Sequence, residues 1–299
     1  MKNQSETKRG SALVLLAALC WSTMGSLTRV LNAAGIFSRE VTQVRVTVAF
    51  LTIGIFLLCN DRTLLRVRWK DLWCFLGTGL CSLLMYCICY FKALETTDIS
   101  VVTVLAYMSP VYLMLLGTVL FREKLTGRKL LALALSVSGC VLVSGVLGGF
   151  HGDSTGILLA LAAGFFYALY SVFTKYAIVR GYQTWTILLY TFGFAALGSS
   201  FLCDWPSLTG VLVQRPVLSL LCIAFGEITC CIPYALYSRG LQKLELSRAS
   251  ILNCVDVVFS SVFGAVFFRE YPGWTALLGI ALVLTAVILL SLSETKKRT

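Results

Sequence analysis

Charged residues are scarce in this sequence. They make up 13% of the 299 residues, whereas a soluble globular domain carries roughly 25%, and 58% of the residues are hydrophobic. This balance excludes an ordinary soluble fold, because the apolar side chains exceed what one core can bury. The net charge of +11 does not indicate a nucleic-acid interface, because the basic residues form short clusters between apolar runs.

The sequence also lacks the usual signs of metal, disulfide and nucleotide chemistry. It has a single histidine, His151, and neither a CxxC pair nor a GxxxxGK[ST] phosphate loop. We therefore predict no metal site, no cofactor and no direct use of ATP. Most of the twelve cysteines lie inside apolar runs, where a thiol behaves as a small packing residue.

Long apolar runs fill almost the whole chain. A helix needs about 20 apolar residues to cross the hydrocarbon core, and the run from Ser11 to Ala34 is too long for a secretory signal. We predict an all-α membrane protein with ten transmembrane helices. The predicted spans are 11–33, 38–60, 71–92, 99–121, 128–147, 155–177, 184–204, 217–239, 247–268 and 273–293.

The positions of Lys and Arg predict how the chain crosses the membrane. Most of the 25 basic residues fall in alternate loops, at the two ends of the chain and around residues 62–70, 122–129, 175–180 and 239–248. Basic loops are retained on the cytoplasmic side. We therefore predict a multi-pass protein of the cell membrane with both termini in the cytoplasm.

The two halves of the sequence resemble each other. Adding 147 to positions 93–143 gives an ungapped match, in which Phe121-Arg122-Glu123 falls on Phe268-Arg269-Glu270. The predicted domains are accordingly 1–147 and 148–299. Because each repeat holds five helices, the second copy enters the membrane from the opposite side. Inverted repeats of this kind are typical of secondary transporters, whose substrate site lies near the midplane.

Several motifs resemble the EamA-type branch of the drug/metabolite transporter superfamily. They are Trp21-Ser22-x-x-Gly25, Arg45, Met108-Ser109-Pro110-Val111, Phe166-Tyr167-Ala168, Val255-Asp256-Val257-Val258 and the two Phe-Arg-Glu triplets. The resemblance covers essentially the whole chain and implies transport, without indicating the substrate. Two positions depart from the family: Asp256-Val257 stands where relatives often carry Glu-Pro, and Glu227 replaces a small or hydroxylated residue.

Three ionisable residues are expected at membrane depth, where a charge is costly and usually functional. Glu227 and Asp256 lie near the middle of successive predicted helices, and Asn253 shares a helix face with Asp256. We expect the two acids at similar height and propose that they couple protons or bind substrate. The alternative is a structural pair, with Asp256 held by Asn253 or Arg45. For Arg45 itself we favour a structural ion pair over a substrate carboxylate, and we interpret the Phe-Arg-Glu triplets as structural.

Aromatic residues are expected to complete the site. Beside acids, their ring faces suit an organic cation, although each taken singly is more often a packing residue. Pro110 and Pro233 fall inside predicted spans and predict kinks. The candidate aromatic site residues are Trp21, Tyr86, Tyr107, Tyr170 and Tyr234.

Taken together, the sequence predicts a secondary active transporter rather than an enzyme. We expect alternating access, proton coupling or exchange, and export of a small polar metabolite that is amino-acid-like or an organic cation. The expected partners are that molecule, the lipid bilayer and a coupling proton. The alternatives are an importer of a cationic nutrient and, more distantly, an intramembrane enzyme with two acids or a membrane scaffold.

Overall fold

The computed structural model describes residues 2–97, 99–143, 153–269 and 273–292. These residues form helices and connecting turns, with no β-strand among them. The predicted all-α class and its inverted five-helix repeats are confirmed. The predicted boundary between residues 147 and 148 lies outside the described residues.

Each predicted span is occupied by one helix or by successive helical segments. In chain order they are α1 (Lys2–Ser22) with α2 (Met24–Ala33); α3 (Ser38–Asn60); α4 (Leu72–Leu76), η3 (Gly77–Leu84) and α5 (Met85–Leu94); α6 (Ile99–Ala106) and α7 (Ser109–Phe121); α8 (Gly127–Val143); α9 (Ser154–Val179); α10 (Thr184–Ser200); α12 (Val217–Gly226), η5 (Glu227–Cys231) and α13 (Ile232–Leu241); α14 (Leu246–Asn253) and α15 (Val255–Phe268); and α16 (Trp274–Leu292). Within the described ranges, seven spans are long and apolar enough to cross a membrane, or eight if the bent pair of α10 and the following helix counts as one.

That following helix, α11 (Trp205–Gln214), lies where we predicted only a loop. It turns away from α10 by 103°. The Asp204 carboxylate accepts a hydrogen bond from the Ser207 N–H at 3.2 Å, and Pro206 stands in the first turn. Both are helix-start signals, so this short sequence forms a helix of its own after the bend.

Five of the described spans are interrupted, and two kinds of interruption recur in both repeats. η3 and η5 are π-helical segments in the third and eighth spans, and π-segments often mark functional positions. The fourth and ninth spans break at Tyr107–Met108 and at Cys254. Pro110 and Pro233 begin new segments after an interruption, where proline is tolerated because the first turn lacks N–H partners.

The two repeats pack in the same way with exchanged partners. η3 lies on α9 and α10, whereas η5 and α13 lie on α1 and α3. Two glycines permit these crossings: a Cβ on Gly79 would lie 2.6 Å from the Thr191 carbonyl, and one on Gly226 would lie 2.6 Å from the Val48 Cβ. The third and eighth spans therefore occupy equivalent places in an inverted arrangement.

The Phe-Arg-Glu triplets end helices in matching conformations. Arg122 and Arg269 both adopt the left-handed conformation, with φ of 54° and 57°, and their caps bond to the Gly117 and Gly264 carbonyls. This is the αL helix end, although arginine rather than glycine adopts it. Of the two glutamates, Glu270 lies outside the described residues.

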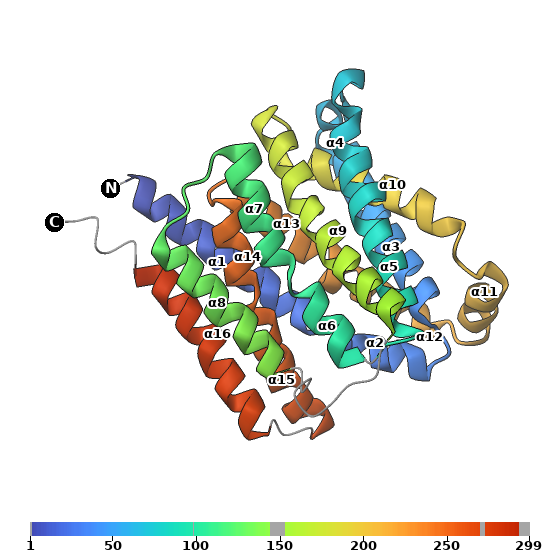
Figure 1. Ribbon diagram of the computed structural model, residues 1–299. Helices are drawn as coiled ribbons and strands as arrows, with labels where there is room; N and C mark the ends of the chain where they lie inside the picture. Colours follow the sequence, from blue (N-terminus) through green and yellow to red (C-terminus); the bar gives the residue numbers. More distant parts are fainter. Residues whose placement is uncertain (1, 98, 144–152, 270–272, 293–299) are drawn as a thin grey trace.

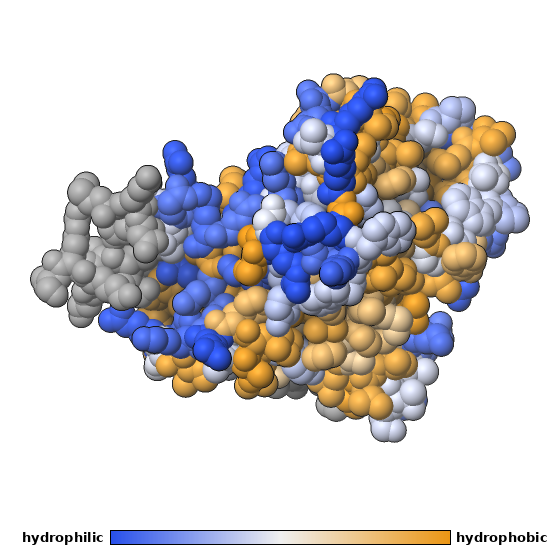
Figure 2. All heavy atoms as spheres, turned by 90° about the horizontal axis from the view of Figure 1, so that it is seen from above, coloured by the Kyte–Doolittle hydropathy of each residue, from blue (hydrophilic) through white to orange (hydrophobic). Residues whose placement is uncertain are grey.

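The bundle has two polar ends, which we name from their loops. The basic face carries the start of α1 and the loops 61–71, 122–127, 180–183 and 242–245, and lies toward the upper left in Figure 1. The opposite face carries α11 and the turns 34–37 and 95–97. Viewed from above, hydrophilic residues gather in clusters with hydrophobic surface around them (Figure 2). Exposed apolar side chains such as Ile55, Leu158 and Val266 lie along the flanks, where a bilayer would cover them.

Candidate functional site

Aromatic side chains from different helices meet in the middle of the bundle. The Trp21 ring on α1 lies 5.1 Å from Tyr234 and 5.4 Å from Tyr237 on α13. Tyr170 on α9 lies 4.9 Å from Tyr234, edge to face, and its hydroxyl shares a 2.9 Å hydrogen bond with Ser238. The predicted residues Trp21, Tyr170 and Tyr234 therefore form one aromatic wall that joins the two repeats.

Asp256 lies beside a second group of tyrosines. Its neighbours are Tyr86 on α5, Tyr107 between α6 and α7, and Tyr167 on α9. The Tyr86 and Tyr167 rings lie 5.4 Å apart. Asp256 makes no ion pair with a described residue, and its buried Oδ1 has no hydrogen-bond partner. Because an unsatisfied buried carboxylate oxygen is costly, this atom is well placed to accept a bond from a ligand.

Arg45 is buried and is another electrostatic neighbour of Tyr86. Only 4% of its surface is exposed, and it lies among Tyr86, Cys87, Cys230 and Tyr234. Its NH1 group donates to the Met24 thioether at 3.1 Å, a weak acceptor, and its Nε has no partner. The favoured structural ion pair for Arg45 is not found among the described residues.

Tyr86 is an electrostatic neighbour of both charged groups, Arg45 and Asp256. Asn253 does not hold Asp256 as the structural alternative required. Its Nδ2 instead donates to the Tyr167 hydroxyl at 3.4 Å, while its buried Oδ1 has no partner. The centre thus brings together a cation, an anion, an amide and tyrosines, with polar atoms unused on each of the first three.

Glu227 has different surroundings from Asp256. It begins η5, which packs on α3 and α1, and its electrostatic neighbours are Cys230 and Cys231. Its Oε1 is buried without a hydrogen-bond partner. The expected side-by-side pair of acids is therefore replaced by two acids in separate environments, and any shared role would operate at a distance.

A cavity of about 270 Å³ lies between the second, third and seventh spans toward the opposite face. Its lining includes Cys87, an electrostatic neighbour of Arg45, so the cavity reaches a residue near the buried cation. Sequence reasoning missed Cys87, which the packing interpretation of the cysteines had set aside. The lining residues are Arg39, Thr42, Leu84, Cys87, Ile88, Phe91, Lys92, Glu95, Ser199, Phe201 and Leu202.

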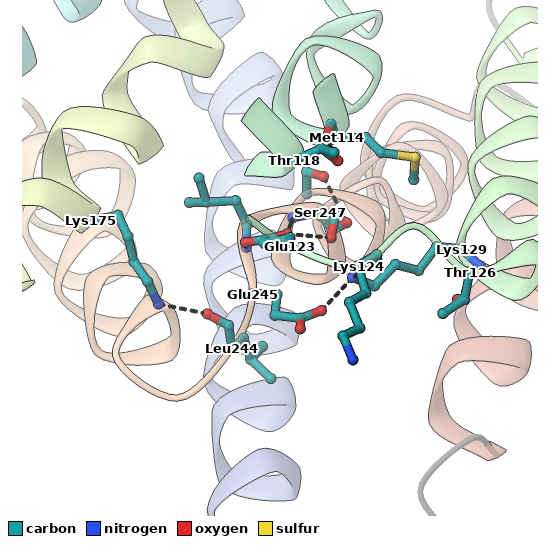
Figure 3. A network of polar contacts seen from close by, with 12 residues as sticks. Met114, Thr118, Glu123, Lys124, Thr126, Lys129, Lys175, Leu244, Glu245 and Ser247 are labelled. Carbon is teal, nitrogen blue, oxygen red and sulfur yellow. Dashed lines mark hydrogen bonds and ion pairs between the residues drawn. The ribbon is translucent and has the colours of Figure 1, made fainter. Parts of the chain in front are cut away.

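The basic face is held by polar contacts around the turn between α13 and α14 (Figure 3). The Glu123 carboxylate accepts bonds from the Leu246 N–H at 2.6 Å, the Ser247 N–H at 3.2 Å and the Ser247 hydroxyl at 2.6 Å. It thereby caps the start of α14, as acceptors at a helix N-terminus do. Glu123 belongs to the first Phe-Arg-Glu triplet, so the structural interpretation of that triplet accounts for this contact.

Two lysines complete the closure of this turn. Lys175 Nζ, from α9, donates to the carbonyls of Leu241 at 2.6 Å and Leu244 at 2.9 Å. Lys129, from α8, forms an ion pair with Glu245 and donates to the Lys124 carbonyl at 3.0 Å. We call Glu123, Lys129, Lys175 and Glu245 the basic-face clamp. It ties both repeats to one turn, and of its four residues only Glu123 belongs to a motif that stands out in the sequence.

Comparison with known proteins agrees with this architecture. The EamA-like transporter family matches residues 8–145 and 154–292, once in each half. The chain belongs to the EamA-like transporter family. It is therefore a transporter of the drug/metabolite type, as the sequence motifs implied.

Relatives span nearly the full length of the chain. An uncharacterized transporter of Archaeoglobus fulgidus is 28% identical over 94% of this chain and 95% of its own length. YwfM, an uncharacterized transporter of Bacillus subtilis, is 26% identical over 97% and 96%. The pseudopaline exporter CntI of Pseudomonas aeruginosa is 24% identical over 97% and 98%.

A solved crystal structure shares the fold of this chain. It aligns with a TM-score of 0.79 over 97% of this chain and 99% of that one, at 20% sequence identity. At that identity the likeness concerns the fold alone. The alignment covers both repeats, so the shared fold is that of the whole chain and not of one repeat alone.

Proposed function

We propose that this transporter is a secondary carrier that exports a small zwitterionic, amino-acid-like metabolite by alternating access. One observation carries the proposal: Arg45 and Asp256 are both electrostatic neighbours of Tyr86, each with a buried polar atom that lacks a hydrogen-bond partner and without an ion-pair partner among the described residues. A ligand with a carboxylate and an ammonium would satisfy both groups. The carboxylate would bind Arg45, and the ammonium would bind Asp256 and the tyrosine faces.

The two ends of the bundle support alternating access. The clamp closes the basic face, while the cavity beside Cys87 opens toward the opposite face. If the basic face is cytoplasmic, as its lysines and arginines favour, this conformation faces outward. Release to the outside then matches export, which the name of the relative CntI also supports.

We further propose that Asp256 and Glu227 couple transport to protons. Asp256 and Glu227 each keep a buried oxygen without a partner, and neither makes an ion pair with a described residue. An acid in this state can carry a proton while the protein changes conformation. Uptake into proteoliposomes across an imposed pH gradient tests it: Asp256→Asn and Glu227→Gln should weaken the dependence on the gradient, and unchanged dependence in both would end this part.

The substrate class is tested by thermal unfolding of the purified protein with matched ligands. Each of a panel of amino acids is compared with its decarboxylated amine and its deaminated acid. A true substrate at a hundredfold its Kd stabilises the protein by about 2.7 kcal/mol. We expect stabilisation by the zwitterion only, and its loss in Arg45→Gln and in Asp256→Asn.

The second candidate, import of a cationic nutrient, is favoured by Asp256 with its three tyrosines. It predicts that the amine stabilises as well as the zwitterion and that Arg45→Gln leaves this effect intact. That result would overturn the zwitterion proposal. Counterflow in oriented proteoliposomes would then establish the direction of transport.

A further inference from the structure

A separate polar site lies at the basic face, between the 61–71 loop and the turn after α9. At its base is Asp71, only 6% exposed. Its Oδ1 forms an ion pair with Arg180 Nε at 2.9 Å, and its Oδ2 pairs with Arg68 Nε at 2.8 Å. The Tyr182 hydroxyl donates to the same Oδ2 at 2.7 Å. One buried carboxylate thus fixes two arginines from distant parts of the chain.

The two guanidinium groups are oriented further by aromatic rings. Arg180 lies 4.9 Å from the centre of the Trp73 ring, and Arg68 lies 5.8 Å from the Tyr182 ring. Both arginines use Nε to reach Asp71, which leaves their terminal nitrogens for other acceptors. Arg180 NH1 makes a weak contact with the Cys74 thiol at 3.8 Å. The arginines are therefore held in place with donors to spare.

These donors border a hollow of about 410 Å³. Its lining includes Arg66, Arg68 and Arg180 and contains no acidic residue. Arg66 makes no ion pair with any described residue. Since Asp71 lies behind the lining and neutralises one charge, the hollow keeps a net positive charge that a dianion would satisfy.

We propose that this hollow binds a phosphate group. Guanidinium forks match phosphate oxygens in geometry and charge, and three of them converge here. The phosphate could belong to an anionic phospholipid headgroup or to a free phosphate compound, because the recognition chemistry is the same. Two tryptophans next to these arginines are exposed, Trp69 at 88% and Trp73 at 41%. Trp73 contacts Arg180 and Trp69 follows Arg68 in the chain; such aromatic residues favour the membrane interface, and basic pockets there bind anionic headgroups.

The test uses the purified full-length protein, freed of lipid, with Arg66→Gln and a matched control, Arg62→Gln. Arg62 belongs to the same loop but does not line the hollow, and its Nε donates to the Leu58 carbonyl at 3.0 Å. Neither substitution breaks an ion pair with a described residue, so both variants should fold. Native mass spectrometry in detergent measures bound phosphatidylglycerol against phosphatidylcholine, and thermal unfolding measures stabilisation by inorganic phosphate.

We expect Arg66→Gln to weaken phosphatidylglycerol binding by about fivefold, the effect of one basic residue near an anionic surface, and Arg62→Gln to leave it unchanged. Stabilisation by inorganic phosphate that Arg66→Gln abolishes would support the site and identify a free phosphate as its ligand. Equal weakening in both variants would show only general attraction to basic loops, and no binding of either probe would show no site. Either of these last two results overturns the proposal.

Discussion

At the basic face, the turn between α13 and α14 is held by α9 through Lys175, by the end of α7 through Glu123 and by α8 through Lys129. At the opposite face, among the described residues of the corresponding turn after α5, the Thr96 hydroxyl donates to the Asp153 carboxylate at 2.9 Å. A cavity enters beside that turn, with Glu95 in its lining. In the part of the chain that the structure describes, the clamp holds the basic face while a cavity enters at the opposite face, and an alternating carrier must exchange such a difference between states.

The largest effect is expected from Glu123→Ala. The substitution removes three accepted hydrogen bonds at the start of α14, and the lost cap and charge-assisted bonds should cost about 2 kcal/mol. Chemical unfolding and hydrogen exchange at the first turn of α14 measure it. The control is Glu95→Ala at the opposite face, which should change stability by less than about 0.5 kcal/mol. Equal losses would show that the two faces are not held differently.

A somewhat smaller effect is expected from Lys175→Met. The variant keeps an unbranched side chain of similar length but leaves the carbonyls of Leu241 and Leu244 without their donor. This loss should lower the free energy of unfolding by about 1 kcal/mol. Hydrogen exchange should quicken in residues 241–246 and transport rates should change, because the closed basic face loses one of its ties. Lys92→Met in the cavity lining is the control. Exchange that stays slow in the variant would remove Lys175 from the clamp.

The opposite face should respond to acid through Asp153. The carboxylate accepts from the Gly156 N–H and the Thr96 hydroxyl, and these bonds lower the pKa of Asp153. The pKa of Asp153 is lower in the folded protein than in the unfolded chain, where it is about 4. The ionised carboxylate therefore stabilises the fold above that pH, and this stabilisation is lost as the pH falls through the folded-state pKa. The stability difference between the wild type and Asp153→Asn should therefore be constant above about pH 5 and shrink below it. A difference that does not vary between pH 3 and 7 would contradict this.

Much of the fold could be predicted because the signals are local or repeated. Apolar runs of membrane length mark the spans, and the two Phe-Arg-Glu triplets reveal the duplication at a constant spacing. The missed features depend on subtler cues. Helix α11 begins at Asp204 and Pro206, a start signal that was present but lay in an assumed loop. The break at Thr23 has no proline; there the hydroxyl of Thr23 bonds to the Cys20 carbonyl at 2.7 Å, which competes with the helix.

The arrangement of the site residues was harder to predict than their identity. Arg45 and Asp256 could be singled out because charges are rare inside apolar runs, but their partners depend on how distant helices rotate. A single sequence does not show that both are neighbours of Tyr86 while Glu227 has Cys230 and Cys231 as its neighbours. The clamp as a whole was not predicted for a related reason. Glu123 and Lys175 lie about fifty residues apart in the chain, and both contact the α13–α14 turn.

The smallest effect should come from Gly117→Ala, and it tests whether the clamp is specific. A Cβ on Gly117 would lie 2.9 Å from Glu123 Oε2 and 3.0 Å from its Cδ, so the carboxylate must move away from α14. Alanine in a helix otherwise gains about 0.5–1 kcal/mol over glycine. In the wild type the two effects should nearly cancel. In a Glu123→Ala background, only the gain should remain. If Gly117→Ala changed stability equally in both backgrounds, the residues would not be coupled, and the tight contact at the basic face would have no energetic role.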